Sequence, residues 1–583
     1  MQPVLEPETK LGARGLHVRW LGQVPFLEAL DLQRRLYAGT SDHLLLLEHP
    51  SVFTLGTSAN PAHLLVDPAS VGAELHRADR GGDITYHGPG QLTGYPILSV
   101  AGKRGGGMID TVAYVRGVEQ LIIDALTEVG LPGCGRLDKH AGVWVDIEGT
   151  PRKIAAIGVR LSRGRSMHGF ALNVDPDMQW FDRIVPCGIT EFGVTSLAAE
   201  GVDGSMREVV DVVSRLAIER WDLDGLGDRQ DVVWRHSDTD LSPFSRGAGP
   251  GEQVTPVVGA AKAATDTQLG VVEGLTIGRR SNTTARRRGR LDEAGVGVGF
   301  DVRERKPSWM KARINITDDY RRLKKTLRSL DLVTVCEEAG CPNIYECWSD
   351  GTATFMINGE RCTRACGFCL VDTSKPEPLD LGEPERVAQA TLEMGLAHVV
   401  VTAVARDDLP DGGASGFANT ITAVRAASSD TRIEVLIPDF QGSIEQLQVV
   451  FDAGPDVLNH NMETVARMQR AVRPNAGYAR SLTVIARAKA AGLTAKSGLI
   501  VGLGETDDEI DATLIDLGAI GCDIATIGQY LRPTSNHLPI DRWVTPEQFT
   551  RWVDVGRNAG IGHVESSPMT RSSYHARESA DSL

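Results

Sequence analysis

Short apolar runs alternate with longer amphipathic stretches in the first part of the chain, which is the pattern of a mixed α/β domain. Apolar runs at 44–48, 143–146 and 154–159 predict strands, and the amphipathic stretch 112–129 predicts a helix. We therefore expect one mixed α/β domain over residues 15–226.

The apolar periodicity fades between residues 227 and 304, where Gly, Ser, Thr, Asp and Arg become frequent. This composition predicts a flexible linker. Its arginine-rich run at 279–290 is interpreted as a solvated charged tether, although such a run could also contact an acidic partner or nucleic acid.

Strand–helix alternation returns in the last part of the chain, after a cysteine-rich helical entry that begins near residue 311. The apolar runs that predict strands are 397–402, 433–437, 456–459, 494–500 and 524–527. A helix-length segment follows each of them, which predicts a parallel sheet of partial (β/α) barrel type over residues 305–583. Loops at the carboxyl ends of such strands normally form the active site.

The composition narrows the classes of protein that fit this organisation. With 583 residues, the chain is long enough for several domains. The formal net charge of −15 argues against dedicated nucleic-acid binding, which depends on many Lys and Arg contacts to phosphate. No apolar run reaches membrane-spanning length, and the N-terminus has no signal pattern. We expect a cytoplasmic protein with no membrane partner, whose cysteines are thiols or metal ligands.

Most of the nine cysteines fall into two triplets in the second half. The spacings are Cys336-x4-Cys341-x5-Cys347 and Cys362-x3-Cys366-x2-Cys369. Thiolates are the soft ligands of iron–sulfur clusters, and each triplet could hold three irons of a four-iron cluster, leaving the fourth iron open. The alternative is a zinc knuckle, which the triplets fit poorly because structural zinc normally takes four ligands.

The second half resembles a known enzyme family through these cysteines. The C-x3-C-x2-C spacing, with Phe368 before the last cysteine, is similar to that of the radical S-adenosylmethionine enzymes. Together with the upstream triplet, the likeness narrows to lipoyl synthase over about residues 305–576. Further matching segments lie at 305–309, 406–413, 459–463, 502–505, 529–533 and 571–574.

The resemblance implies two 4Fe–4S clusters. Cys362, Cys366 and Cys369 would hold the cluster whose open iron binds S-adenosyl-L-methionine, so that one electron cleaves this cofactor to a radical able to attack an unactivated C–H bond. The methionine and adenosine ends of the cofactor could be approached by the backbone at Gly412, Gly413, Gly502 and Gly504. Either glycine pair could instead be only a turn.

The upstream triplet would hold an auxiliary cluster that supplies sulfur. By the same resemblance, Ser573 completes the ligand set of Cys336, Cys341 and Cys347, with Ser572 as an open alternative. A hard oxygen among soft thiolates would be easily displaced, which suits a cluster that gives up sulfur.

The first half contains a distinctive glycine-rich run from Arg80 to Gln91. Its exposed N–H groups could face an acyl carbonyl or a long chain, and it lacks the spacing of a nucleotide phosphate loop. Together with segments 48–56, 152–158, 168–173 and 186–189, it makes residues 15–226 resemble the lipoyl(octanoyl)transferases. That resemblance implies a fold of the biotin/lipoate ligase type.

The resemblance implies that Cys187 takes an octanoyl group from a carrier-protein thioester, with Lys153 as its partner. An ammonium near a thiol lowers the thiol pKa, while a partly desolvated lysine can itself act as a base, and both roles are open. The implied substrate-binding residues are Arg80, Gly81, Gly82, Asp83, Ile84, Thr85, Tyr86, His87, Ala156, Ile157, Gly158, Gly169, Phe170 and Ala171.

Other reactive residue types receive a structural interpretation in both halves. We interpret His87 and His168 as shaping the binding loop, and Cys134 and Cys522 as small buried hydrophobes. The basic stretch between Arg152 and Arg165 could dock an acidic acyl carrier protein or could be a solvated face.

The two resemblances imply consecutive reactions: octanoyl transfer to a lysine of a lipoyl-domain protein, then insertion of two sulfurs at C6 and C8. Implied partners are octanoyl-acyl carrier protein, lipoyl-domain proteins (the E2 subunits of dehydrogenase complexes and the glycine cleavage H protein), and an electron donor such as flavodoxin or ferredoxin. One alternative is an ATP-dependent lipoate or biotin ligase in the first half. Another is a non-catalytic zinc-bearing scaffold for lipoyl domains.

Overall fold

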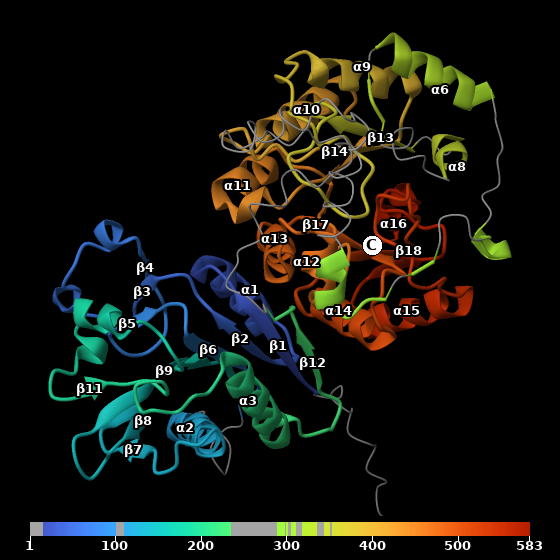
Figure 1. Ribbon diagram of the computed structural model, residues 1–583. Helices are drawn as coiled ribbons and strands as arrows, with labels where there is room; N and C mark the ends of the chain where they lie inside the picture. The colour runs from blue at the N-terminus through green and yellow to red at the C-terminus, as the bar shows by residue number, and fades with distance from the viewer. Residues whose placement is uncertain are drawn as a thin grey trace, which may run out of the picture. The chain divides into compact units, whose positions relative to one another are not determined.

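A computed structural model describes residues 15–100, 110–234, 288–297, 299–300, 305–310, 318–330, 332–334, 343–349 and 352–582. The chain divides into two compact units, Met1–Trp234 and Arg235–Leu583, which are described separately (Figure 1). No helix in the described residues is both long enough and apolar enough to cross a membrane.

A mixed nine-stranded sheet forms the first unit, in the order β12-β1-β2-β6-β10-β9-β8-β7, with β11 paired to β9. The strands are β1 (Leu16–Gln23), β2 (Asp42–Glu48), β6 (Gln91–Ile97), β7 (Gly135–Leu137), β8 (His140–Val145), β9 (Arg152–Ser162), β10 (Arg165–Asn173), β11 (Gly193–Val194) and β12 (Asp228–Asp231). Strand β2 is almost wholly buried because its residues 44–47 are four consecutive leucines.

Three helices pack on this sheet: α1 (Phe26–Ala38), α2 (Thr111–Glu128) and α3 (Met206–Trp221). The Asp110 carboxylate caps α2 by accepting the amide of Ala113 at 3.0 Å. The apolar stripes of α2 and α3 share one buried cluster with β1, β2 and β10, which includes Leu44, Leu121 and Val213. This cluster is the core of the unit.

A small three-stranded sheet, in the order β4-β3-β5, lies beside the large one in the same unit. It consists of β3 (Val52–Leu55), β4 (Glu74–Arg77) and β5 (Ile84–His87). The short helical turn η4 (Pro186–Gly188) packs against β5. The glycine-rich run singled out in the sequence therefore forms β5 and the loops on either side of it.

A seven-stranded parallel sheet forms the second unit, with its strands in sequential order from β13 to β19. They are β13 (Thr352–Ile357), β14 (His398–Ala403), β15 (Arg432–Leu436), β16 (Val457–Asn459), β17 (Thr494–Val501), β18 (Ile524–Gln529) and β19 (His563–Ser566). No pairing joins β19 to β13 among the described residues. This confirms the predicted parallel sheet of partial barrel type.

Helices separate most of these strands in the chain, as in a (β/α) repeat: α9 (Glu383–Met394), α10 (Ala414–Ala427), α11 (Ile444–Asp452), α13 (Tyr478–Ala490), α14 (Asp507–Ala519) and α15 (Pro546–Asn558). Strand β14 contains a continuous apolar run, as expected for a parallel sheet covered by helices. Val399, Val400 and Val401 of β14 are all buried.

Both ends of the expected linker belong to folded units. Asp228–Asp231, predicted to lie in the linker, is strand β12 and pairs in parallel with β1. Near the other end, Phe300 donates its amide to Ile540 O at 2.6 Å, and Glu293 lies 3.6 Å from Arg470 in an ion pair. Residues 235–287 of the expected linker lie outside the described part of the chain.

Candidate active sites

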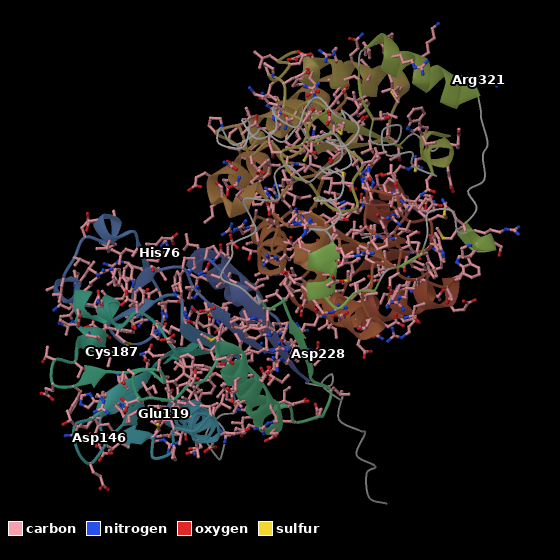
Figure 2. The ribbon with its side chains drawn as sticks, in the orientation of Figure 1. His76, Glu119, Asp146, Cys187, Asp228 and Arg321 are labelled. Carbon is pink, nitrogen blue, oxygen red and sulfur yellow. The ribbon has the colours of Figure 1, made fainter. Side chains whose placement is uncertain are left out.

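The first unit contains a cavity of about 370 Å³ that gathers nearly all of the residues expected at an acyl site. Cys187, from turn η4 and labelled in Figure 2, lines it together with Lys153, from β9. So do the expected residues Arg80, Gly81, Gly82, Asp83, Thr85, His87, Ala156, Ile157, Gly158, Gly169, Phe170 and Ala171. The candidate nucleophile and the candidate lysine therefore face a common space.

Ile84 and Tyr86 are the two expected binding residues that the cavity wall does not include. They alternate with Thr85 and His87 along β5, so their side chains point to the other side of the strand. There they join a buried cluster with Phe53, and the Tyr86 ring stacks on Trp180 at 4.9 Å. Their placement corrects the expectation that the whole run from residue 80 to 87 faces the substrate.

The backbone fixes the position of Cys187. Cys187 has a left-handed φ of 56°, which turns the chain sharply at the cavity edge. Gly188 donates its amide to Val185 O at 3.0 Å, and Val185 donates its own to His63 O at 2.8 Å. A non-glycine residue in this conformation stores strain, and such residues are concentrated at functional sites.

Asp83 anchors the loops that surround this turn. Its carboxylate accepts the amides of Asn60 at 2.9 Å and Ile84 at 2.7 Å, and it contacts His63 Nδ1. A Cβ atom at Gly188 would lie only 2.7 Å from Asp83 Oδ2. The turn that carries the thiol is therefore packed directly against a carboxylate whose hydrogen bonds are used within the protein.

Lys153 is 7% exposed, with its Nζ 4.7 Å from the ring centroid of Trp144. No ion pair with a carboxylate is found for this lysine in the parts of the chain that the structure describes. Its ammonium therefore faces an indole ring and the cavity.

Arg80 builds the cavity wall and is not free to bind a distant charge. Its buried guanidinium donates to Thr54 O and Thr54 Oγ1, both at 2.8 Å, and to Asp83 O at 2.9 Å. Burial lowers the pKa of Arg80, and the neighbouring Cys187 opposes this shift. Because the guanidinium ties the glycine-rich loop to β3, its loss would open the cavity.

The two histidines singled out in the sequence are both hydrogen-bonded within the protein. His87 Nδ1 lies 2.8 Å from Gln91 Oε1, and His168 Nε2 lies 2.7 Å from Asp79 Oδ1. Burial lowers the pKa of both imidazoles. This environment supports the interpretation of His87 and His168 as residues that shape the loop.

The first unit is expected to become less stable as pH decreases, because of the buried residue His49. The His49 ring contacts Val24 O at 2.7 Å and Tyr95 Oη at 2.8 Å. Burial lowers the pKa of His49 to about 4, from an ordinary value of 6.5. As pH decreases, His49 therefore binds a proton in the unfolded chain before it does so in the folded chain. The contribution of His49 to the free energy of unfolding is complete above pH 6.5 and is lost as pH falls toward 4. At pH 5 the loss amounts to roughly 2 kcal/mol.

Thermal unfolding of the chain at pH 7 and pH 5 measures this loss. A His49→Gln variant is the control, because it cannot titrate and should lose less stability between the two pH values. Equal pH dependence in the variant would assign the effect to other groups.

Apolar residues also line the cavity. Strand β9 advances by about 16 Å from Lys153 to Gly158, both of which line the cavity. Its wall also includes Gly188 and Ile189, from the segment around Cys187, and residues that the sequence did not indicate: Phe26, Ala78, Tyr95, Lys139, His140 and Ala141. The cavity thus combines polar residues with a partly apolar wall, as an acyl group requires.

Two glycines allow β6 and β10 to pack closely behind this wall. Gly94 is paired with Phe170, and a Cβ atom at Gly94 would lie 2.2 Å from the Phe170 ring. A Cβ atom at Gly169 would lie 2.1 Å from Gly94 O. The Phe170 ring, which lines the cavity, therefore packs directly against the backbone of Gly94.

Most of the basic stretch expected to dock a carrier protein forms ion pairs within the unit. Arg152 pairs with Glu200 at 3.0 Å, and Arg160 pairs with Asp79. Arg165 donates to Ser41 O at 2.7 Å and lies 3.3 Å from Asp42. Arg163, exposed at the turn between β9 and β10, is the member of the stretch that best fits a docking role.

In the second unit, Cys362, Cys366 and Cys369 lie in the loop that follows β13, at the carboxyl end of the sheet. Cys362 Sγ accepts the amides of Ala405 at 3.3 Å and Arg364 at 3.4 Å. Burial raises the pKa of Cys366 to about 11 and that of Cys369 to about 12, and the charge of each neighbouring thiolate adds to this effect. The three thiols are therefore close enough to influence one another.

These thiols fit an iron–sulfur cluster better than a single ion. No three His, Cys, Asp or Glu side chains converge on one ion position within the described ranges. A cluster does not need such convergence, because each cysteine binds a different iron, and a metal would offset the cost of forming buried thiolates.

An ion-pair network that the sequence did not indicate holds this cysteine loop. Arg364 lies inside the triplet and forms ion pairs with Asp407 at 2.8 Å and Asp439 at 2.7 Å. Burial alone would raise the pKa of Asp439, but Arg364 more than offsets this, and the pKa falls below its usual range. The network joins the cysteine loop to the loops after β14 and β15.

The two expected cofactor-binding glycine pairs are also explained by packing within the protein. A Cβ atom at Gly413 would lie 2.7 Å from Asn358 Nδ2, and one at Gly412 would lie 2.7 Å from Gln446 Oε1. Gly502 is packed against Gln529, and Gly504 against Val296. Contacts of these glycines with a cofactor remain a prediction.

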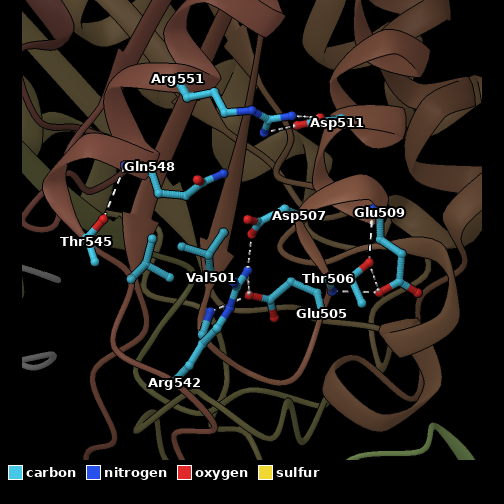
Figure 3. A network of polar contacts seen from close by, with 12 residues as sticks. Val501, Glu505, Thr506, Asp507, Glu509, Asp511, Arg542, Thr545, Gln548 and Arg551 are labelled. Carbon is cyan, nitrogen blue, oxygen red and sulfur yellow. Dashed lines mark hydrogen bonds and ion pairs between the residues drawn. The ribbon is translucent and has the colours of Figure 1, made fainter.

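Glu505 organises the loop after β17 that carries the second glycine pair. Its carboxylate accepts the amides of Gly502 and of Leu503, the latter at 2.9 Å. Figure 3 shows Glu505 beside Arg542, which pairs with Asp507 at 2.6 Å. The loop is therefore a rigid part of the carboxyl face of the sheet.

Cys336 and Cys341 of the other triplet lie outside the described residues, but Cys347 lies in α8 (Ile344–Ser349). The turn that contains Ser572 and Ser573 contacts the same region. Tyr574 Oη donates to Glu346 Oε2 at 3.2 Å, and Asn343 Nδ2 donates to Met569 O at 2.7 Å. Two segments far apart in the sequence, each with an expected cluster ligand, are thus brought together.

Comparison with known proteins assigns a family to each half. The lipoyl protein ligase A/B catalytic domain matches residues 25–216. The N-terminal domain of lipoyl synthase matches residues 287–341, and the radical S-adenosylmethionine superfamily matches residues 356–517.

Two lipoyl synthases and one solved structure are among the proteins that this chain is similar to. Lipoyl synthase of Rubrobacter xylanophilus is 55% identical over 281 residues, covering 48% of this chain and 88% of the relative. Lipoyl synthase of Frankia casuarinae is 54% identical over 273 residues, covering 47% of this chain and 82% of the relative. A solved archaeal bi-partite lipoate protein ligase with its E2 lipoyl domain, from Thermoplasma acidophilum, is 18% identical with a TM-score of 0.31, covering 38% of this chain and 88% of that chain.

Proposed function

Because the chain belongs to the lipoyl synthase family and carries a lipoate ligase/transferase-type catalytic domain ahead of it, we propose that it makes protein-bound lipoate in two consecutive steps. The first unit transfers an octanoyl group from an acyl carrier protein to a lysine of a lipoyl domain. The second unit inserts two sulfurs at C6 and C8 of that octanoyl group.

The observation that carries the transfer step is the shared cavity of Cys187 and Lys153. The Cys187 thiolate attacks the carbonyl of the carrier thioester, and the carrier leaves as a free thiol. The ε-amine of the lipoyl-domain lysine then attacks the acyl-cysteine, so that an amide forms and the Cys187 thiol is released. The apolar wall along β9 holds the acyl chain in one orientation during both attacks.

Cys362, Cys366 and Cys369 would hold the cluster that cleaves S-adenosylmethionine, and Cys336, Cys341 and Cys347 with Ser573 would hold the cluster that is consumed as sulfur donor. When bound, the first of these clusters supplies the electron that makes C–H activation possible. The residues of the chain position this chemistry: Arg364, with its two aspartate partners, fixes the loop that presents the thiolates. An electron donor such as flavodoxin or ferredoxin completes the set of partners.

An assay with alternative acyl donors tests the transfer step. The purified chain is mixed with an apo lipoyl domain and either octanoyl carrier protein or free octanoate with ATP. We expect octanoylation from the carrier protein without ATP, because a thiol nucleophile accepts a thioester directly. Octanoylation from octanoate only when ATP is present would show an adenylating ligase instead.

An anaerobic extension of the same assay tests the second step. S-adenosylmethionine and a reductant are added after octanoylation, and the mass of the lipoyl domain reports sulfur insertion. Metal analysis accompanies it: iron with labile sulfide supports catalysis, whereas zinc alone would indicate a scaffold protein.

A further inference from the structure

A break in the strand pairing places Trp144 opposite Lys153. Val143 of β8 pairs with Ala155 of β9, but the next residue, Trp144, pairs with Lys153, so that Ile154 is passed over. Without this shift Trp144 and Lys153 would point to opposite faces of the sheet, because side chains alternate along a strand. Irregularities of this kind re-aim side chains and are frequent beside active sites.

Gly142 permits the irregularity. Its φ of 123° lies in the region that favours glycine, and a Cβ atom there would lie 2.6 Å from Ala155 O. The same Cβ atom would lie 3.4 Å from the Lys153 side chain. The backbone at Gly142 therefore makes room both for the shifted strand and for the lysine.

The indole of Trp144 is held in place on several sides. Its side chain is among the largest that are fully buried, and its Nε1 donates to His140 O at 3.2 Å. The rings of His140 and Phe192 stand edge-on to it, at centroid distances of 6.1 and 5.6 Å. A ring with so many neighbours offers one fixed face to Lys153.

That face suits a charged lysine and not a neutral one. A cation 4.7 Å from the ring centroid is attracted by the negative charge above the indole plane. The described residues provide no carboxylate partner for the Lys153 ammonium. The indole face is thus the main stabilising contact for a positive charge at this position.

We infer that Trp144 is a positioning residue that holds Lys153 as an ammonium, and not as a neutral base, at the cavity that Cys187 also lines. This inference rests on the proposed octanoyl transfer. It chooses between the two lysine roles that the sequence left open, and it explains why the sheet is irregular at this point.

A double-mutant cycle on the full chain tests the inference. The rate of acyl-adduct formation on the protein is measured by intact mass, with octanoyl carrier protein as donor, for Trp144→Leu, Trp144→Phe, Lys153→Ala and the combination of Trp144→Leu with Lys153→Ala. We expect Trp144→Leu to lower the rate roughly tenfold, and Trp144→Phe to lower it less because a phenyl ring keeps a weaker π face. In the Lys153→Ala background, Trp144→Leu should have little further effect.

Trp234→Leu is the matched control. Trp234 also lies beside a cation, with the Arg207 guanidinium 6.0 Å from its ring centroid, but it follows β12, at the opposite edge of the sheet from β8. Its loss should leave the acylation rate unchanged. Thermal unfolding of each variant separates a positioning effect from a loss of folded protein.

Two results would overturn the inference: equal rates for Trp144→Phe and Trp144→Leu, or the same loss from Trp144→Leu with and without Lys153. Failure of the proposed function looks different. In that case the unmodified chain itself forms no acyl adduct, and the inference falls with it.

Discussion

Replacing Cys187 with serine abolishes octanoyl transfer in the outcome we expect, with a fall in rate on the order of a thousandfold or more. A serine hydroxyl is not ionised at neutral pH and is a much weaker nucleophile toward a thioester than a thiolate. The left-handed turn that presents residue 187 accepts serine as readily as cysteine, so the change removes the chemistry and keeps the geometry.

Intact-mass measurement of the chain and of the lipoyl domain follows this result directly. Cys134→Ala is the matched control, since Cys134 is buried in the core of the same unit and burial raises its pKa to about 11. Octanoylation by the Cys187→Ser variant at the original rate would exclude an acyl-cysteine and favour the ligase chemistry.

Replacing Cys366 with alanine has the second largest expected effect: complete loss of sulfur insertion with octanoyl transfer unchanged. The substitution removes one of three thiolates from the loop after β13, and a cluster held by two cysteines would not be retained. The acyl cavity lies in the other unit, which has its own core and should fold and act as before.

The measurement is the mass of the lipoyl domain together with the iron and sulfide content of the chain. Cys522→Ala is the control, because Cys522 is a buried thiol of the same unit that lies outside both triplets. Lipoyl product formed by Cys366→Ala at the original rate would remove this loop from the reaction. A mixture of the Cys187→Ser and Cys366→Ala chains should restore both steps, since each retains one intact unit.

The strands that the sequence predicted are mostly apolar runs, and two of those that it missed, β19 and β12, are polar. The predicted strands at 433–437 and 494–500 match β15 and β17 to within one residue at each end. Strand β19, His563–Ser566, is polar at three of its four positions, and β12 is entirely polar. Both lie at the edges of their sheets, where one side is open to solvent and apolar character is not required.

The sequence predicted some of the residues that line the cavity around Cys187 and missed others, and this difference has a physical reason. Residues of continuous motifs, such as the run from Arg80 to His87, can be found from local sequence because turns and glycines have recognisable patterns. Phe26, Tyr95 and His140 line the same cavity but come from separate elements, so only the folded chain brings them together. The face of β5 that lines the cavity also depends on which distant residues, such as Trp180 and Phe181, cover its other face.

In the second half, too, residues that are brought together from separate elements could not be found from local sequence. The cysteine spacing predicts the thiolate loop, and Arg364 lies within it, but its partner Asp439 is 75 positions further along. Nothing in the local pattern around Asp439 distinguishes it from a surface aspartate. Its burial and its ion pair arise from the adjacency of parallel strands, which is a property of the sheet.

The close contact between Gly94 and Phe170 has a consequence for the size of acyl group that the cavity accepts. Gly94 does not line the cavity, yet any side chain at this position would displace the aromatic ring that does. A single substitution at Gly94 on β6 would therefore change the acyl chain length that the cavity prefers. Under the proposed octanoyl transfer, acyl preference would then depend on a position that does not line the cavity.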